Sequence, residues 1–142
     1  MGFESDKSIV FLIAKVRNVL KKEFENVLKP YDLSYAHRVI LIRLSEKDDC
    51  TQKELAQDTY FEQSNLTLML DKLEAKGLVK RVPKENDRRA YIIKITPEGE
   101  KLRNVLIQMG ENVMDKALNG VNKKQKEELA NLLELMYQNL KS

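Results

Sequence analysis

Residues 51–78 read TQKELAQDTYFEQSNLTLMLDKLEAKGL and contain two short amphipathic helices separated by a brief turn. The capping box Thr51-Gln52-Lys53-Glu54 predicts the start of the first helix. The second helix has apolar residues at three- and four-residue spacing, namely Leu66, Met69, Leu70 and Leu73. Gly77 suits the left-handed residue after a helix, and Leu78 can then pack back on Leu73. This order predicts a helix-turn-helix, a motif that also occurs in proteins that bind no DNA.

A basic β-hairpin follows this motif directly. Residues 78–82 and 90–95 have the composition of short strands, and a polar loop joins them. Between Val79 and Lys94 there are six basic and two acidic residues, a local charge of +4 against +3 for the whole chain. Such a turn can be simply a solvated loop. Directly after a helix-turn-helix, however, arginine at the tip suits the negative potential of a narrow DNA minor groove.

Amphipathic helices lie on both sides of this segment. Residues 9–28 have an apolar stripe at helical spacing that stops before Pro30, and Ser34 can cap a second helix. After the hairpin, Thr96-Pro97-Glu98 has the residue types that begin a helix, and Asn122 can cap a final one. The predicted fold is therefore mainly α with a small β-hairpin.

The terminal helices have more apolar surface than the segment between them can cover. Residues 51–95 are few for an independent core. Stripes at both ends of the chain can pack together across a two-fold axis, and two-fold dimers are the commonest oligomers. We expect one domain over residues 1–142, in which residues 1–32 and 98–142 form a dimerisation bundle and residues 33–97 form the remaining lobe. The alternative is a monomeric six-helix fold.

Composition excludes several classes of protein. The 142 residues include 42% hydrophobic and 33% charged side chains, as in an ordinary globular domain. The longest apolar run, residues 9–14, is shorter than the ~20 residues of a membrane span, and the N-terminus does not resemble a signal peptide, so we expect a cytoplasmic protein.

Cys50 is the only cysteine and His37 the only histidine, so we expect no metal site and no cofactor. Cys50 is interpreted as an inert thiol rather than a redox sensor. With no glycine-rich phosphate loop and no base–nucleophile pair, an enzyme is not expected.

Two stretches resemble the MarR (multiple-antibiotic-resistance regulator) family of winged helix-turn-helix transcription factors. They are LTLMLDKLEAKGLV at residues 66–79 and DRRAYIIKITPEG at residues 87–99, where an Asp-x-Arg pattern precedes a strand and Thr-Pro-x-Gly. The resemblance extends over about residues 33–102. It implies a homodimer, a pseudo-palindromic operator, and often a small phenolic or lipophilic effector that weakens DNA binding. It also implies that Arg89 enters the minor groove with Asp87 as its partner.

The predicted function is sequence-specific binding of double-stranded DNA, as a transcriptional repressor that an effector relieves. The predicted DNA-binding residues are Gln63, Ser64, Asn65, Thr67, Lys80, Lys84, Asp87, Arg88 and Arg89. Those of the second helix would face the major groove, where Gln and Asn can read adenine, and the lysines and Arg88 would contact phosphates. Candidate effector-binding residues are Arg17, Tyr31, Tyr35 and His37. For His37, a bond to the backbone or to water at a helix start is the favoured interpretation.

The alternative hypothesis is a winged-helix adaptor that binds another protein and no specific DNA. Two positions of the second helix favour it. Glu62 is a poor helix cap and repels phosphate, and Leu68 stands where the family commonly has arginine. The family pattern is also not followed at Tyr60, where glycine is usual, and at Arg38, where an aromatic residue is common.

Overall fold

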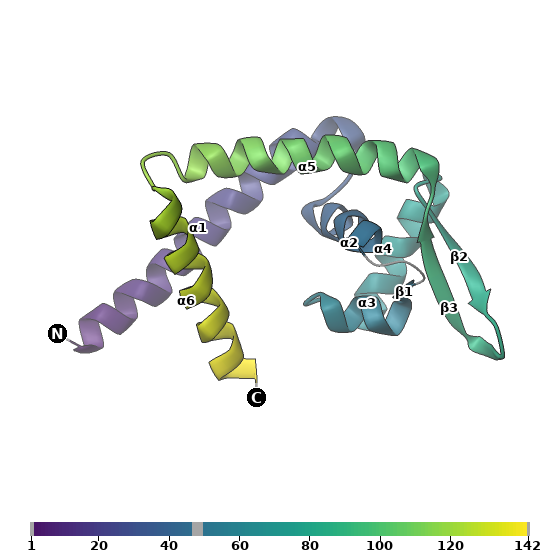
Figure 1. Ribbon diagram of the computed structural model, residues 1–142, viewed down its shortest axis with the longest axis horizontal. Coiled ribbons are helices and arrows are strands. Elements are labelled where there is room, and N and C mark those ends of the chain that lie inside the picture. The colour runs from purple at the N-terminus through teal and green to yellow at the C-terminus, as the bar shows by residue number, and fades with distance from the viewer. Residues whose placement is uncertain (1, 47–49, 142) are drawn as a thin grey trace. The chain divides into compact units, whose positions relative to one another are not determined.

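The computed structural model describes residues 2–46 and 50–141, with the side chains of residues 2–7, 45, 46 and 88 left aside. The described residues form two compact units that divide within a long helix, one ending at Gly110 and one beginning at Glu111. In chain order (Figure 1), the elements are α1 (Gly2–Leu28), the 3₁₀ helix η1 (Lys29–Tyr31), α2 (Tyr35–Glu46), β1 (Cys50–Thr51), α3 (Gln52–Asp58), α4 (Gln63–Ala75), β2 (Val79–Lys84), β3 (Asp87–Ile95), α5 (Pro97–Ala117) and α6 (Lys123–Lys141). The mainly α fold that the sequence predicts is confirmed.

Both ends of the helix-turn-helix have the predicted caps. At the start of α3, the Thr51 hydroxyl accepts a bond from the Glu54 N–H and the Glu54 carboxylate accepts one from the Thr51 N–H, each 3.1 Å long. At the end of α4, Gly77 has a φ of 74°. Its N–H donates to the Glu74 carbonyl, and the Leu78 N–H donates to the Leu73 carbonyl, each at 2.9 Å. This pair of bonds is the Schellman motif, and it turns the chain from α4 into β2.

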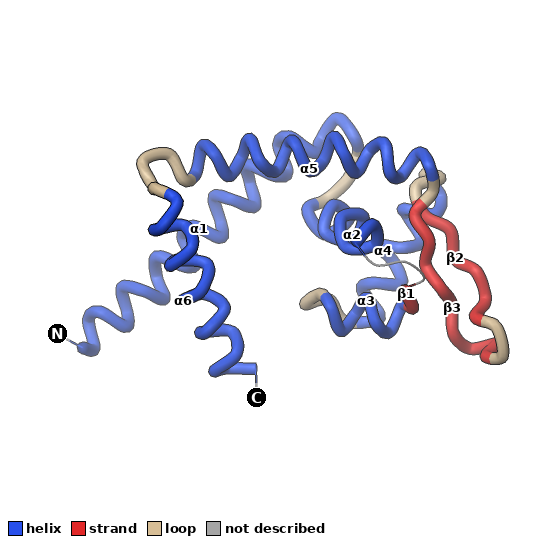
Figure 2. Tube along the Cα trace, in the orientation of Figure 1, coloured by secondary structure: helices blue, strands red, loops and turns tan. Residues whose placement is uncertain are grey.

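The sheet differs from the prediction, because it has three antiparallel strands in the order β1-β3-β2 rather than a hairpin alone (Figure 2). Cys50 pairs with Ile93 and Thr51 with Ile92. A strand of two residues carries no alternation signal, which is why the sequence did not reveal it. The hairpin strands are also longer than predicted, since β2 continues through Pro83 to Lys84. Proline has no backbone N–H to donate, and it is tolerated here because β2 is an edge strand.

The core of the first unit lies between α4 and the elements that surround it. Leu66, Leu70 and Leu73, on one face of α4, are fully buried. The same core contains other fully buried side chains, namely Leu28, Ile40, Leu41, Leu55, Ile93 and Leu106. Burial of one face of α4 fixes which of its residues remain on the surface.

The start of α5 is attached to the end of α4. The Thr96 hydroxyl accepts a bond of 3.0 Å from the Gly99 N–H and donates one of 2.7 Å to the Gly77 carbonyl. A Cβ atom at Gly99 would collide with the backbone carbonyl of Leu78. Glycine is therefore required at this position because two backbones approach closely there.

In the second unit, α6 begins with a capping box. The Asn122 side chain accepts from the Gln125 N–H at 2.8 Å, and the Gln125 side chain accepts from the Asn122 N–H at 2.9 Å. This confirms Asn122 as the predicted cap. No helix among the described residues is long and apolar enough to cross a membrane.

Candidate nucleic-acid interface

The first two turns of α4 present the four predicted major-groove residues to solvent. Gln63, Ser64, Asn65 and Thr67 are all exposed, and so is Leu68. Glu62 occupies the cap position and has no capping hydrogen bond from its side chain to the described residues. Polar side chains in the first turn of an exposed helix match the part of a recognition helix that reaches base edges.

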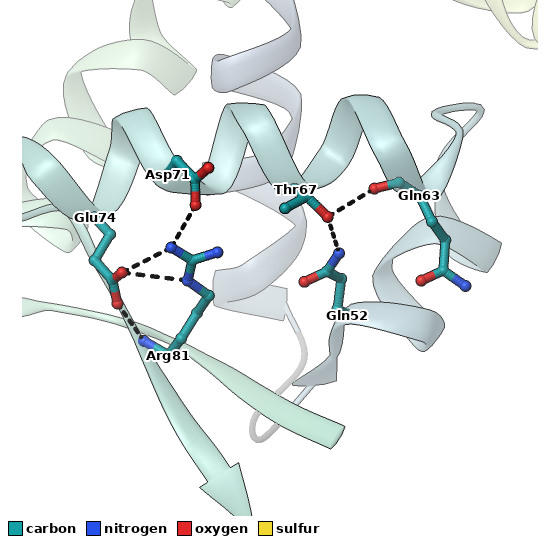
Figure 3. Close-up of polar contacts among 6 residues, drawn as sticks. All are labelled: Gln52, Gln63, Thr67, Asp71, Glu74 and Arg81. Atoms are coloured by element: carbon teal, nitrogen blue, oxygen red, sulfur yellow. Dashed lines mark hydrogen bonds and ion pairs between the residues drawn. The ribbon is translucent and has the colours of Figure 1, made fainter. Parts of the chain in front are cut away.

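The hydroxyl group of Thr67 is already engaged within the protein. It donates a bond of 3.0 Å to the Gln63 carbonyl and accepts one of 2.7 Å from the Gln52 side-chain amide (Figure 3). Since a hydroxyl has one hydrogen, Thr67 can accept a further bond but cannot donate one while these contacts last. No pattern in the sequence indicated this role of Gln52, which the Thr51–Glu54 box positions at the first turn of α3.

The hairpin carries the predicted basic residues: Lys84 and Arg89 lie near its tip, and Lys80 lies near its base, where it pairs with Lys94. Lys80, Lys84, Asp87 and Arg89 are exposed, whereas the side chain of Arg88 lies outside the part of the chain that the structure describes. The Asp87 carboxylate accepts a bond of 3.0 Å from the backbone N–H of Arg89. Asp87 thus fixes the backbone from which the Arg89 side chain projects.

Arg81, on β2, joins the hairpin to α4. Its guanidinium contacts Glu74 at 2.8 Å and Asp71 at 2.6 Å, and its backbone N–H donates to Glu74 at 3.0 Å (Figure 3). These hydrogen bonds lower the pKa of Glu74 and raise that of Arg81. In the sequence, Arg81 is one of six basic residues of the hairpin segment. The signal for its role is the spacing of Asp71 and Glu74, which lie three residues apart on one face of a helix.

His37 completes a cap at the start of α2. Its Nδ1 accepts a bond of 3.0 Å from the Ser34 N–H and lies 2.8 Å from the Ser34 hydroxyl. The His37 N–H donates back to that hydroxyl at 3.4 Å. Burial lowers the pKa of His37, and the neighbouring Lys72 and Lys76 lower it further, against the opposing effect of Asp32. Because Nδ1 accepts the Ser34 N–H, the neutral form of the ring that fits this cap has its proton on Nε2.

Of the other candidate effector residues, Tyr31 and Tyr35 lie near the junction of α1 and α2, whereas Arg17 lies about three turns before the end of α1. Tyr35 packs edge-on against Phe24, with ring centroids 4.9 Å apart. Arg38 lies over the same ring at 4.9 Å and donates from Nε to the Leu106 carbonyl at 3.1 Å. Tyr31 is half-buried in η1, and Arg17 is exposed on α1.

Comparison with known proteins identifies the class to which this arrangement belongs. Residues 33–91 match the family model described as MarR family. The HTH-type transcriptional regulator SarZ of Staphylococcus epidermidis is 30% identical over 109 residues, which cover 77% of this chain and 74% of SarZ. The chain belongs to the MarR family.

Solved structures of related proteins superpose on almost the whole length of this chain. The transcriptional regulator BldR from Sulfolobus solfataricus has a TM-score of 0.84 and 32% identity, and the match covers 97% of this chain and 99% of BldR. The transcriptional regulator PA3341 has a TM-score of 0.81 and 30% identity, covering 94% and 98% of the two chains. The protein is thus a winged helix-turn-helix transcription regulator, which favours DNA binding over the adaptor hypothesis.

Proposed function

We propose that the protein binds a pseudo-palindromic operator in the cytoplasm and represses transcription there. In this proposal, Gln63, Ser64 and Asn65 face the major groove, and Arg89 enters the adjacent minor groove. The phosphate contacts come from Lys80, Lys84 and Arg88. The observation that supports the proposal is the Arg81 brace, by which we mean the bonds from Arg81 on β2 to Asp71 and Glu74. These bonds join the C-terminal half of α4 to the basic hairpin, and so fix the hairpin relative to the helix whose first turns are exposed.

We infer that the binding unit is a homodimer. Apolar side chains recur at helical spacing on the exposed surface of α6, namely Leu129, Leu132, Leu133, Met136 and Leu140. A similar exposed stripe runs along α1, with Ile9, Leu12, Ile13, Val16 and Val19. Exposed apolar stripes of this length are typical of an interface, and a second copy of the chain offers the same stripes. The expected bundle comprises residues 1–32 and 98–142.

We also infer that a small phenolic or lipophilic effector binds beside the junction of α1 and α2. Tyr35, with its ring against Phe24, offers an aromatic surface, and the charged Arg38 lies next to it. Arg17, Tyr31 and His37 are the other expected contacts, with His37 restricted to its Nε2 side because the cap occupies Nδ1. Binding there would weaken DNA binding if it moved α1 relative to α2.

Selection of bound sequences from a random pool of duplex DNA tests this function. The expected result is a pseudo-palindrome whose half-sites are about 10 bp apart, because two recognition helices would be separated by one turn of the duplex. Repeating the selection with candidate phenols tests the effector. If no sequence is enriched over the starting pool, the proposed operator recognition is wrong.

A further inference from the structure

Leu68 is at the centre of the outward face of α4. The buried residues of this helix, Leu66, Leu70 and Leu73, share one side. At 3.6 residues per turn, Leu68 projects almost directly away from them, one turn after Ser64. Its side chain is 68% exposed, so the residue best placed to face a partner of α4 is apolar.

The polar groups around Leu68 are engaged inside the protein. The Thr67 hydroxyl bonds to Gln63 and Gln52, and the Asp71 carboxylate bonds to Arg81. The next residue, Lys72, contacts Asp32 at 3.3 Å. Beyond its first turn, the outward face of α4 therefore offers an apolar contact, flanked by polar groups that already have partners within the protein.

We propose that Leu68 determines sequence specificity by contacting the C5-methyl group of a thymine in each operator half-site. This inference rests on the proposed function, with α4 in the major groove. The thymine methyl is the apolar group that a base pair presents there, and leucine can neither donate to nor accept from a base edge. Contact between the two removes apolar surface of both from water, which favours binding.

Replacement of thymine by deoxyuridine in the selected operator tests the contact, because it deletes only the methyl group. We expect one symmetric pair of positions at which the replacement weakens binding of the wild-type protein by about fourfold per half-site. The variant Leu68→Ala should bind the thymine operator more weakly and should bind the uracil and thymine operators equally. The variant Leu68→Arg should change the selected base at that position toward guanine.

Thr67→Ser is the matched control, because it removes the neighbouring methyl group and keeps the hydroxyl that bonds to Gln52 and Gln63. This variant should keep the uracil sensitivity. The inference is overturned if no uracil replacement affects the wild type, if Leu68→Ala retains the sensitivity to uracil, or if Thr67→Ser loses it. None of these three results would contradict the proposed operator binding. Failure to select any operator would instead overturn the proposed function together with this inference. Thermal melting of each variant verifies that the exposed substitution leaves the fold intact.

Discussion

Glu74 accepts three hydrogen bonds from Arg81, one from the backbone N–H and two from the guanidinium, at 2.8–3.2 Å. One residue is on α4 and the other on β2, so the contact fixes the hairpin against the recognition helix. Asp71 adds a further bond to the same guanidinium. Planar guanidinium groups form such charge-assisted contacts with defined geometry, which suits Arg81 to a positioning role rather than to phosphate binding.

Replacing Arg81 by methionine should therefore weaken operator binding without changing the number of phosphate contacts. The hairpin would lose its fixed orientation, and we expect about a tenfold loss of affinity, or ~1.4 kcal/mol. The logarithm of the binding constant should keep its wild-type slope against the logarithm of salt concentration. Lys84→Ala is the control, since loss of one phosphate contact lowers this slope by about 1. A lowered slope in Arg81→Met would mean that Arg81 itself touches the DNA backbone.

Arg89→Ala should reduce operator affinity by ~1–3 kcal/mol if the side chain enters the minor groove. Asp87→Ala should give a smaller loss, because the carboxylate bonds to the backbone N–H of Arg89 and only orders the hairpin tip. Titrations of both variants against the selected operator measure this difference. Full affinity in Arg89→Ala would show that Arg89 does not enter the minor groove.

Local chemistry explains which parts of this structure the sequence could predict. The Thr51 and Asn122 caps and the left-handed Gly77 follow from residue types over four or five positions. The β1–β3 pairing and the Arg81 brace join residues between seven and more than forty positions apart, and no short pattern encodes which partners meet. The exposed start of α4 was predictable from its periodicity, whereas the engagement of Thr67 by Gln52 depends on how α3 and α4 pack.

Acid should destabilise the fold through His37. In the folded chain, burial and the nearby lysines hold its pKa below the ordinary value of 6.5, so the unfolded chain binds the proton first. The free energy of unfolding should be unaffected by His37 above pH 6.5 and should fall as the pH drops below it, until the pKa of the folded state is reached. Urea denaturation at a series of pH values measures this dependence.

The variant His37→Gln distinguishes the effect of protonating His37 from the effect of losing its helix cap. A glutamine three residues after Ser34 can accept the same N–H bond and does not titrate, so this variant should keep the cap and flatten the pH dependence below pH 6.5. His37→Ala should also flatten it but should lose about 0.5–2 kcal/mol at neutral pH. An unchanged pH dependence in His37→Gln would assign the acid sensitivity to other groups.

A charge on the α6 stripe should separate the proposed dimer. Leu132 is 59% exposed in the single chain, and burying a glutamate there against a second copy would remove an unpaired carboxylate from water. We expect Leu132→Glu to be monomeric by light scattering at micromolar concentration and to lose operator binding, since two linked half-sites are then no longer engaged together. Leu68→Glu is the control, because it places the same charge at a similarly exposed leucine of α4 and should remain dimeric. If Leu132→Glu also remains dimeric, α6 does not form the interface and the α1 stripe becomes the surface to test.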